Sequence, residues 1–212
     1  MEIERKGRII YVSCDSRYEV TSTFMRLQEF HESPSKKIRG KYFTLEQFMD
    51  EYANMMGNFT YCSDWSGFNV PGKVYYKFIN MFSSDLLKKE EKMMDLIEKA
   101  TFGLDDTEDD FYIIGTWDDE DIIHEEAHAF FALSPVYRKT MEKLVNDYKR
   151  KNEVGKWIRD MGYDKSVVVD ETQAYLATSD DEYLLESGFK KSWCVPKAFS
   201  NYFNEFKEQY ET

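Results

Sequence analysis

The chain has 212 residues, of which 42% are hydrophobic and 17% aromatic, enough to bury a core in one domain or in one domain with a small lobe. Its formal net charge of −12 argues against a nucleic acid or an anionic membrane as partner, because both are bound through Lys and Arg side chains that neutralise phosphate. The three widely spaced cysteines are typical of reduced thiols, and the chain contains neither a signal-peptide pattern nor an apolar stretch of membrane-spanning length, so we expect a cytoplasmic protein.

The N-terminal part of the chain predicts strands and helices in alternation. Residues 8–14 are rich in Ile, Tyr and Val and predict a strand. Residues 18–31 are ambiguous, because their Phe and Leu residues are helix-spaced whereas a Val-Thr-Ser-Thr run is not. Thr44 and Gln47 form a capping-box pattern, which predicts a helix that ends at Gly57.

A loop rich in Gly, Pro and aromatic residues follows at residues 63–72, and it could either line a substrate cleft or form a tight turn over the core. A short helix is expected to begin near Pro71. Residues 86–100 predict an amphipathic helix that stops near Gly103. The acidic run 105–110 predicts a solvated linker, which would favour basic substrates if it lay near a cleft.

The second half of the chain is predicted to be mainly helical after one strand, residues 111–117. Helices are expected at residues 120–133, after Ser134-Pro135, around Trp157, at residues 167–178 and at residues 199–210. Few strands and many helices indicate the α+β class. We expect an N-terminal α+β part, residues 1–103, and a helical part that carries the functional site, residues 104–212, within one compact domain.

The segment from His124 to His128 spells H-E-x-x-H inside an apolar run. On a helix, this spacing brings two imidazoles onto one face, where they can share a Zn²⁺ ion, with Glu125 beside them as a general base. The chain has only three histidines, and two of them are in this motif. The plainer alternative is a solvent-facing helix with two chance histidines, which the apolar neighbours disfavour. Glu126 points elsewhere and is expected at the surface or in support of the ligands.

A catalytic zinc site needs a third protein ligand. No histidine follows His128, and His31, which we expect at the surface, would have to come from a distant loop. A carboxylate remains, and Glu171 is best placed, because it lies in an apolar helix where an unpaired charge is costly, and because Ala174 and Ala177 allow close helix packing. Weaker candidates are Asp170, Asp180, Asp181 and Glu182. The plainer alternative is an N-terminal helical Glu favoured by the helix dipole.

With these residues the sequence resembles the gluzincin metallopeptidases, over residues 111–178. The match consists of His124, Glu125 and His128, and then of an E-x-x-A stretch that begins at Glu171. The resemblance implies a zincin-like fold, with a small mixed or antiparallel sheet packed against the active-site helix. It also implies that the two histidines and Glu171 bind Zn²⁺, while Glu125 takes a proton from a zinc-activated water that attacks a carbonyl group.

The sequence departs from the thermolysin-like pattern at one position. Those enzymes have an Asp four residues after the ligand Glu, where it holds a zinc-binding histidine; here that residue is Tyr175. A phenol could orient a histidine or donate a hydrogen bond to an oxyanion, or it could simply contribute to packing. The orienting carboxylate would then be Asp121 or Asp170.

Three functions follow as hypotheses. The first is a cytoplasmic zinc-dependent hydrolase, best described as a metallopeptidase with a protein or peptide substrate. The second is a non-catalytic, zincin-like interaction protein with a structural or vestigial metal site. The third is a hydrolase of a non-peptide amide, since the same chemistry serves both bonds. The sequence leaves the oligomeric state open.

Overall fold

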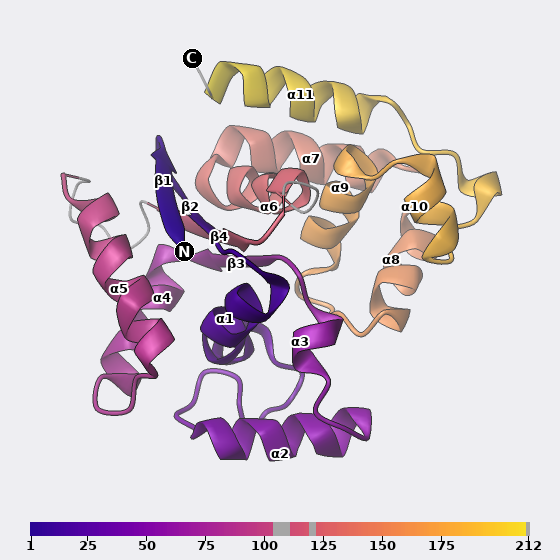
Figure 1. Ribbon diagram of the computed structural model, residues 1–212. Coiled ribbons are helices and arrows are strands. Elements are labelled where there is room, and N and C mark those ends of the chain that lie inside the picture. The colour runs from indigo at the N-terminus through magenta and orange to yellow at the C-terminus, as the bar shows by residue number, and fades with distance from the viewer. Residues whose placement is uncertain (104–110, 119–121, 211–212) are drawn as a thin grey trace. The chain divides into compact units, whose positions relative to one another are not determined.

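The computed structural model describes residues 1–103, 111–118 and 122–210 (Figure 1). Within these residues the chain forms eleven α-helices and one four-stranded mixed sheet, which confirms the α+β class. The predicted acidic linker at 105–110 lies outside them. Among the described residues, no helix is both long and apolar enough to cross a bilayer.

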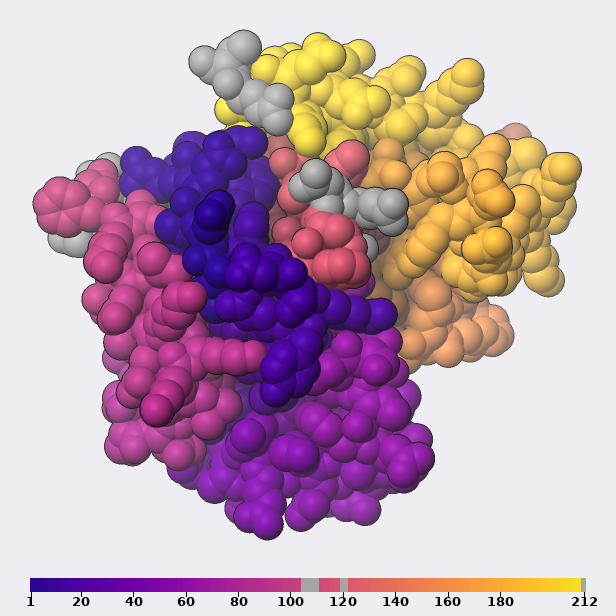
Figure 2. All heavy atoms as spheres, in the orientation of Figure 1, coloured from indigo at the N-terminus to yellow at the C-terminus, as the bar shows by residue number. Residues whose placement is uncertain are grey.

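The chain divides into two compact units, Met1–Ile122 and Ile123–Thr212. The first runs from indigo to salmon-pink in Figure 2, and the second continues to yellow. The first unit extends to Ile122 because the strand at residues 112–116 pairs with the other strands of that unit.

The sheet of the first unit has the strand order β1-β2-β4-β3. Its strands are β1 (Glu2–Lys6), β2 (Ile9–Ser13), β3 (Phe68–Pro71) and β4 (Tyr112–Thr116). β2 pairs in parallel with β4, and the two outer strands pair antiparallel with their neighbours. The inner strands are nearly completely buried, as their continuous apolar sequences predicted.

Neither edge strand was predicted from the sequence. β1 is mostly charged and exposed, which is typical of a protected edge but gives no apolar signal. β3 lies inside the Gly- and Pro-rich segment that we predicted to be a loop, so that prediction was wrong for Phe68–Pro71. Pro71 is tolerated there because it is the last residue of an edge strand.

Among its described residues, the first unit also contains the helices α1 (Arg17–Glu32), α2 (Leu45–Met56), α3 (Tyr61–Asp64), α4 (Gly72–Phe82) and α5 (Lys88–Thr101). The ambiguous segment is α1, capped by the side chain of Ser16 and buried continuously along its middle. The predicted capping box of α2 is present, and Gly57 ends that helix at φ 88°. α1 packs on β3 and β4, where Phe24 fills the space above Gly115.

The second unit contains only helices among its described residues: α6 (Ile122–Leu133), α7 (Pro135–Asp147), α8 (Lys151–Asp160), α9 (Val168–Thr178), α10 (Asp181–Glu186) and α11 (Ala198–Tyr210), with a 3₁₀ turn at Lys191–Trp193. α9 is central, because it packs against α7, α8 and α11 (Figure 1). All its residues from Glu171 to Ala177 are buried. α10 was not predicted, since its acidic sequence indicated a solvated stretch.

Candidate metal site

α6 places two imidazoles on one of its faces. His124 and His128 lie one turn apart, and their rings meet edge to face with centroids 5.0 Å apart. The helix is apolar nearly all round, so its middle is buried, and His128 is only 3% exposed. His124, one turn nearer the start of the helix, is half-buried. The motif is therefore held in the interior of the second unit.

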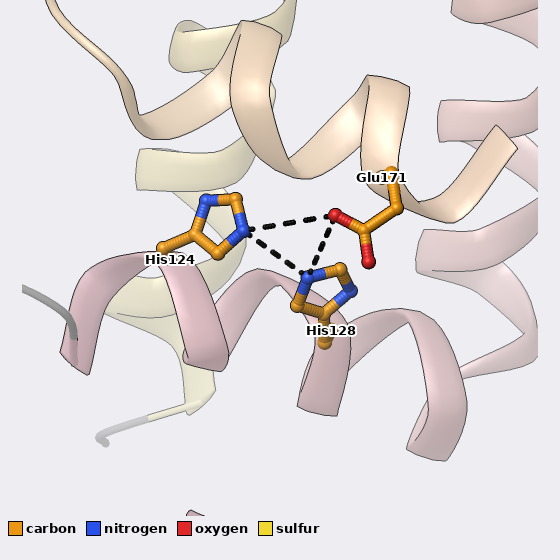
Figure 3. A group of neighbouring side chains, drawn as sticks. All are labelled: His124, His128 and Glu171. Atoms are coloured by element: carbon orange, nitrogen blue, oxygen red, sulfur yellow. Dashed lines mark hydrogen bonds and ion pairs between the residues drawn. The ribbon is translucent and has the colours of Figure 1, made fainter. Parts of the chain in front are cut away.

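The structure brings Glu171 of α9 to the same two rings (Figure 3). Its Oε2 lies 3.7 Å from Nε2 of His128 and 4.0 Å from Nε2 of His124, and the two nitrogens are 3.3 Å apart. Two ligand atoms that each lie about 2.0–2.1 Å from a tetrahedral zinc ion are separated by roughly 3.3–3.4 Å. The two nitrogens thus have the spacing of two corners of a zinc tetrahedron, and the carboxylate oxygen lies somewhat farther from each of them.

Asp170 orients His128. Its Oδ1 lies 2.9 Å from Nδ1 of His128 and also accepts a hydrogen bond from Nε2 of Gln173 at 3.0 Å. Gln173 in turn donates to the carbonyl oxygen of Ala127 and accepts from the hydroxyl of Tyr137, so α6, α7 and α9 are tied together. A carboxylate can only accept, so Nδ1 of His128 carries a proton, and Nε2, which faces Glu171, is the nitrogen left to bind a metal ion.

Asp170 was one of two residues that we predicted for this orienting role. The other, Asp121, lies outside the described residues.

Thr178 orients His124 in the same way, and the sequence analysis missed it. Its Oγ1 lies 3.3 Å from Nδ1 of His124 and donates its own proton to the carbonyl oxygen of Ala174 at 2.8 Å. The hydroxyl oxygen therefore accepts from Nδ1, and the lone pair of Nε2 of His124 also faces the gap. The available signal was its position, seven residues after Glu171 and so on the same face of α9.

Burial and nearby charges shift the pKa values of the two imidazole rings in opposite directions. Burial, helped by the neighbouring His128, lowers the pKa of His124 to about 3. Burial also works to lower the pKa of His128, but the carboxylates of Asp170 and Glu171 outweigh it and raise that pKa well above 6.5. Without a metal, His128 therefore holds an additional proton. The space between the two imidazole nitrogens and the Glu171 carboxylate thus favours a positive charge.

Tyr175 forms a wall of the site. Its ring meets that of His124 edge-on at 4.7 Å, while its hydroxyl lies 3.2 Å from the hydroxyl of Tyr163. Tyr183, which is 53% exposed, stacks on the outer side of Tyr175 with centroids 6.3 Å apart. Tyr163 and Tyr183 lie outside the motif and were not predicted. Burial raises the pKa of Tyr175, so its phenol stays protonated.

The two acids within the motif have different surroundings. Glu125, the predicted base, is 8% exposed, and its charge helps to raise the pKa values of His128 and Tyr163, so it lies within electrostatic reach of the site. Glu126 is 3% exposed and pairs with Lys207 of α11, so the surface position that we considered for it was wrong.

His31 does not join the site. It lies in the first unit at the end of α1 and is half-buried, whereas we expected a surface position.

Asp180, another alternative ligand, caps α10 by accepting a hydrogen bond from the backbone N–H of Tyr183. Among the described residues, the group with ligand atoms close enough to share a metal ion is that of the two α6 histidines and Glu171.

No family model, curated protein or solved structure is significantly similar to this chain. The function therefore has to be argued from the chemistry of the site.

Proposed function

We propose that the chain is a zinc-dependent hydrolase in which His124, His128 and Glu171 hold the ion. One observation carries the proposal: two imidazole nitrogens and a carboxylate oxygen converge within 4.0 Å, with both rings oriented from behind by Asp170 and Thr178. Three such atoms at short range repel one another as acceptors unless a proton or a metal ion lies between them. Two nitrogens and one oxygen are also the donor set of a catalytic zinc site with an open fourth position.

We propose further that the site is of the gluzincin type and that the fold is zincin-like. The H-E-x-x-H motif on α6 and the later glutamate on α9 support this assignment, as does the strand β4, which precedes α6 in the chain. The Asp that thermolysin-like enzymes place after the ligand Glu has a counterpart in Asp170. It comes from the position before Glu171 and holds His128 by the second nitrogen.

A zinc ion in such a site supplies a Lewis acid that acidifies a water molecule and polarises a carbonyl group. Glu125, between the two ligands in sequence, is the residue that would accept the proton. Tyr163 and Tyr175 keep their phenolic protons, because burial raises the pKa of both, and they can donate hydrogen bonds to a developing negative charge. The substrate that we propose is a peptide, and a non-peptide amide is the alternative.

A second candidate function is a non-catalytic interaction protein with a structural metal. The observation that favours it is the aromatic wall around His124: Tyr175, itself in contact with Tyr163 and Trp157, stands at the sequence position where thermolysin-like enzymes have a carboxylate. If a side chain filled the fourth coordination position, the ion would hold α6 to α9 without any turnover. For either function we propose a cytoplasmic location, in keeping with three free cysteines.

The wild type and two variants test the hydrolase. Protein produced with zinc and never exposed to a chelator should contain one zinc ion per chain by mass spectrometry. His128→Ala should lose the ion, because it removes one of the two ring ligands. Glu125→Gln should keep the ion and lose hydrolysis of a mixed peptide library, because it removes only the base.

The matched control is Glu142→Gln, the same change on the exposed side of α7. It should keep both the ion and the activity. Stoichiometric zinc without hydrolysis in the wild type would favour the interaction protein, whereas absence of zinc from the wild type would contradict both candidates.

A further inference from the structure

A basic pocket lies in the first unit, far along the chain from the metal site. It has a volume of about 630 Å³ and opens between the end of α1, the loop that follows it and one face of α4. Phe30 and His31 come from α1, Arg39 from the loop, and Val74, Lys77 and Met81 from α4. The α4 residues are three, four and seven positions apart, so they share one face of that helix.

The charge of the pocket is opposite to that of the chain. The chain has 40 acidic and 28 basic residues, yet the lining contains His31, Arg39 and Lys77 and no acid. A concave surface lined by one sign of charge concentrates ions of the other sign. The positive lining therefore favours an anion.

Two backbone carbonyl oxygens that would otherwise repel an anion already accept hydrogen bonds. The carbonyl oxygen of Phe30 accepts the N–H of Gly40 at 2.8 Å, and that of Glu32 accepts Nη2 of Arg39 at 3.2 Å. The Nε–H of Arg39 is buried and has no hydrogen-bond partner among the described residues. A buried donor on a permanently charged group is costly unless something accepts from it, so the described residues leave the Arg39 guanidinium short of acceptors.

The positive charge comes from Arg39 and Lys77 and not from His31. Burial lowers the pKa of His31, and the charges of Arg39 and Lys73 act in the same direction, against the opposing effect of Glu32. The imidazole is therefore neutral near pH 7. Its Nε2 lies 3.5 Å from a carboxylate oxygen of Glu32. His31 thus lines the pocket without adding positive charge, and the NMR signals of its ring can report binding there.

We propose that this pocket binds a small organic anion with a phosphate or carboxylate head and an apolar body. Arg39 and Lys77 would hold the head, and Phe30, Val74 and Met81 would cover the body. The volume falls within the range of about 300–1,000 Å³ that is usual for small-molecule sites. The site is independent of the zinc proposal, since all its residues lie in the first unit.

The histidines make the test specific, because the chain has only three. Their ring signals can be assigned by NMR on the full chain with His31→Gln and then followed while phenyl phosphate is added at constant ionic strength. We expect a saturable shift of the His31 signal and none of His124 or His128. Arg39→Gln should weaken the apparent affinity about tenfold, since it removes a charged donor. Lys77→Gln should weaken it roughly threefold, since Lys77 is exposed.

Lys88→Gln, an exposed lysine of the same unit outside the pocket, is the control and should leave the titration unchanged. Benzoate in place of phenyl phosphate distinguishes a carboxylate head from a phosphate head. Inorganic phosphate and benzyl alcohol test the head and the body alone, and each should bind at least tenfold more weakly. The proposal is overturned if neither aromatic anion shifts His31, if benzyl alcohol binds as well, or if Lys88→Gln weakens binding as much as the two pocket variants.

Discussion

Each unit buries a cluster of charged side chains, but the two clusters are completed differently. In the first unit, Arg26 and Glu90 are both 0% exposed and form paired hydrogen bonds of 2.9 and 2.5 Å, and Arg26 also binds Asp85 at 3.1 Å. This cluster contains its own cation. In the second unit, the atoms that converge are two imidazole nitrogens and one carboxylate oxygen, and the positive charge that suits them is not fixed by a side chain within the trio.

The comparison separates a structural cluster from a functional one. Burying charge is costly, and a cluster that neutralises itself recovers that cost in the folded state alone. A cluster arranged around acceptors recovers it only when a proton or a metal ion enters. Stability should therefore depend on the side chains in the first unit and on solution conditions in the second.

The largest effect is expected for Arg26→Met. It leaves Glu90 buried without its cation, and so should lower the free energy of unfolding by about 3–5 kcal/mol, measured by urea denaturation. Adding Glu90→Gln should restore part of this loss, because the amide oxygen can still accept from the backbone N–H of Leu87. Lys143→Met, which breaks an exposed pair with Asp147, should cost no more than about 1 kcal/mol. An unchanged urea midpoint for Arg26→Met would refute the structural role.

The second effect concerns pH: between about pH 6.5 and the raised pKa of His128, stability should fall as pH rises without zinc and stay nearly constant with zinc. The raised pKa of His128 stabilises the metal-free protein below about pH 6.5, the unfolded value, and this contribution is lost as pH rises through the folded pKa. The lowered pKa of His124 destabilises it as pH falls from about 6.5 towards 3. These two groups therefore give the metal-free protein a stability maximum near pH 6.5.

Zinc must displace the proton of His128, so its affinity should rise about tenfold per pH unit above 6.5, about 1.4 kcal/mol per unit. Thermal unfolding with and without zinc, at several pH values between 6.5 and 8.5, measures the difference. His31→Gln serves as the control, because it removes a histidine of the other unit. A zinc-induced stabilisation that is the same at every pH would argue against the displaced proton.

Asp170→Asn should weaken zinc binding by about 10–100-fold, because an amide neither fixes the tautomer of His128 reliably nor raises its basicity. Competition with a chromophoric chelator gives the affinity. Asp181→Asn, a change at an exposed position on α10, should leave it within about twofold. Equal affinities for wild type and Asp170→Asn would show that the hydrogen bond at 2.9 Å does not orient the ligand.

The smallest effect is expected for Thr178→Val, which preserves shape and removes one neutral hydrogen bond to His124. Zinc affinity should fall about fivefold, equivalent to about 1 kcal/mol. Thr140→Val is the matched control, since that hydroxyl bonds only to its own helix at Val136. If Thr178→Val binds zinc as tightly as the wild type, the 3.3 Å contact does not position the ring.

Most of the correct predictions came from patterns that span only a few residues. The capping box at Thr44, the i,i+4 histidines and the apolar strand at residues 111–117 each act within a few residues, and the structure has α2, α6 and β4 at these places. Partners distant in sequence could not be found this way. Arg26 and Glu90 are 64 positions apart, and nothing near either residue indicates the pairing.

The candidate site shows the same division. His124 and His128 follow from spacing, and Glu171 follows from the requirement for a third ligand together with its apolar helix. Thr178 and Tyr163 do not, because their role depends on how α9 and the loop before it rotate towards α6. β3 was missed for a related reason, since Pro and Gly obscure a strand that exists only because it pairs with β4.

The contact between Phe24 and Gly115 limits how this protein can evolve. A Cβ atom at position 115 would lie 2.5 Å from the Phe24 ring, closer than any two carbon atoms can approach without bonding. An aromatic ring cannot bend away, so the first methyl group at position 115 would require a smaller residue at position 24 at the same time. In relatives of this chain, a residue larger than Gly at position 115 should therefore occur only with a residue smaller than Phe at position 24.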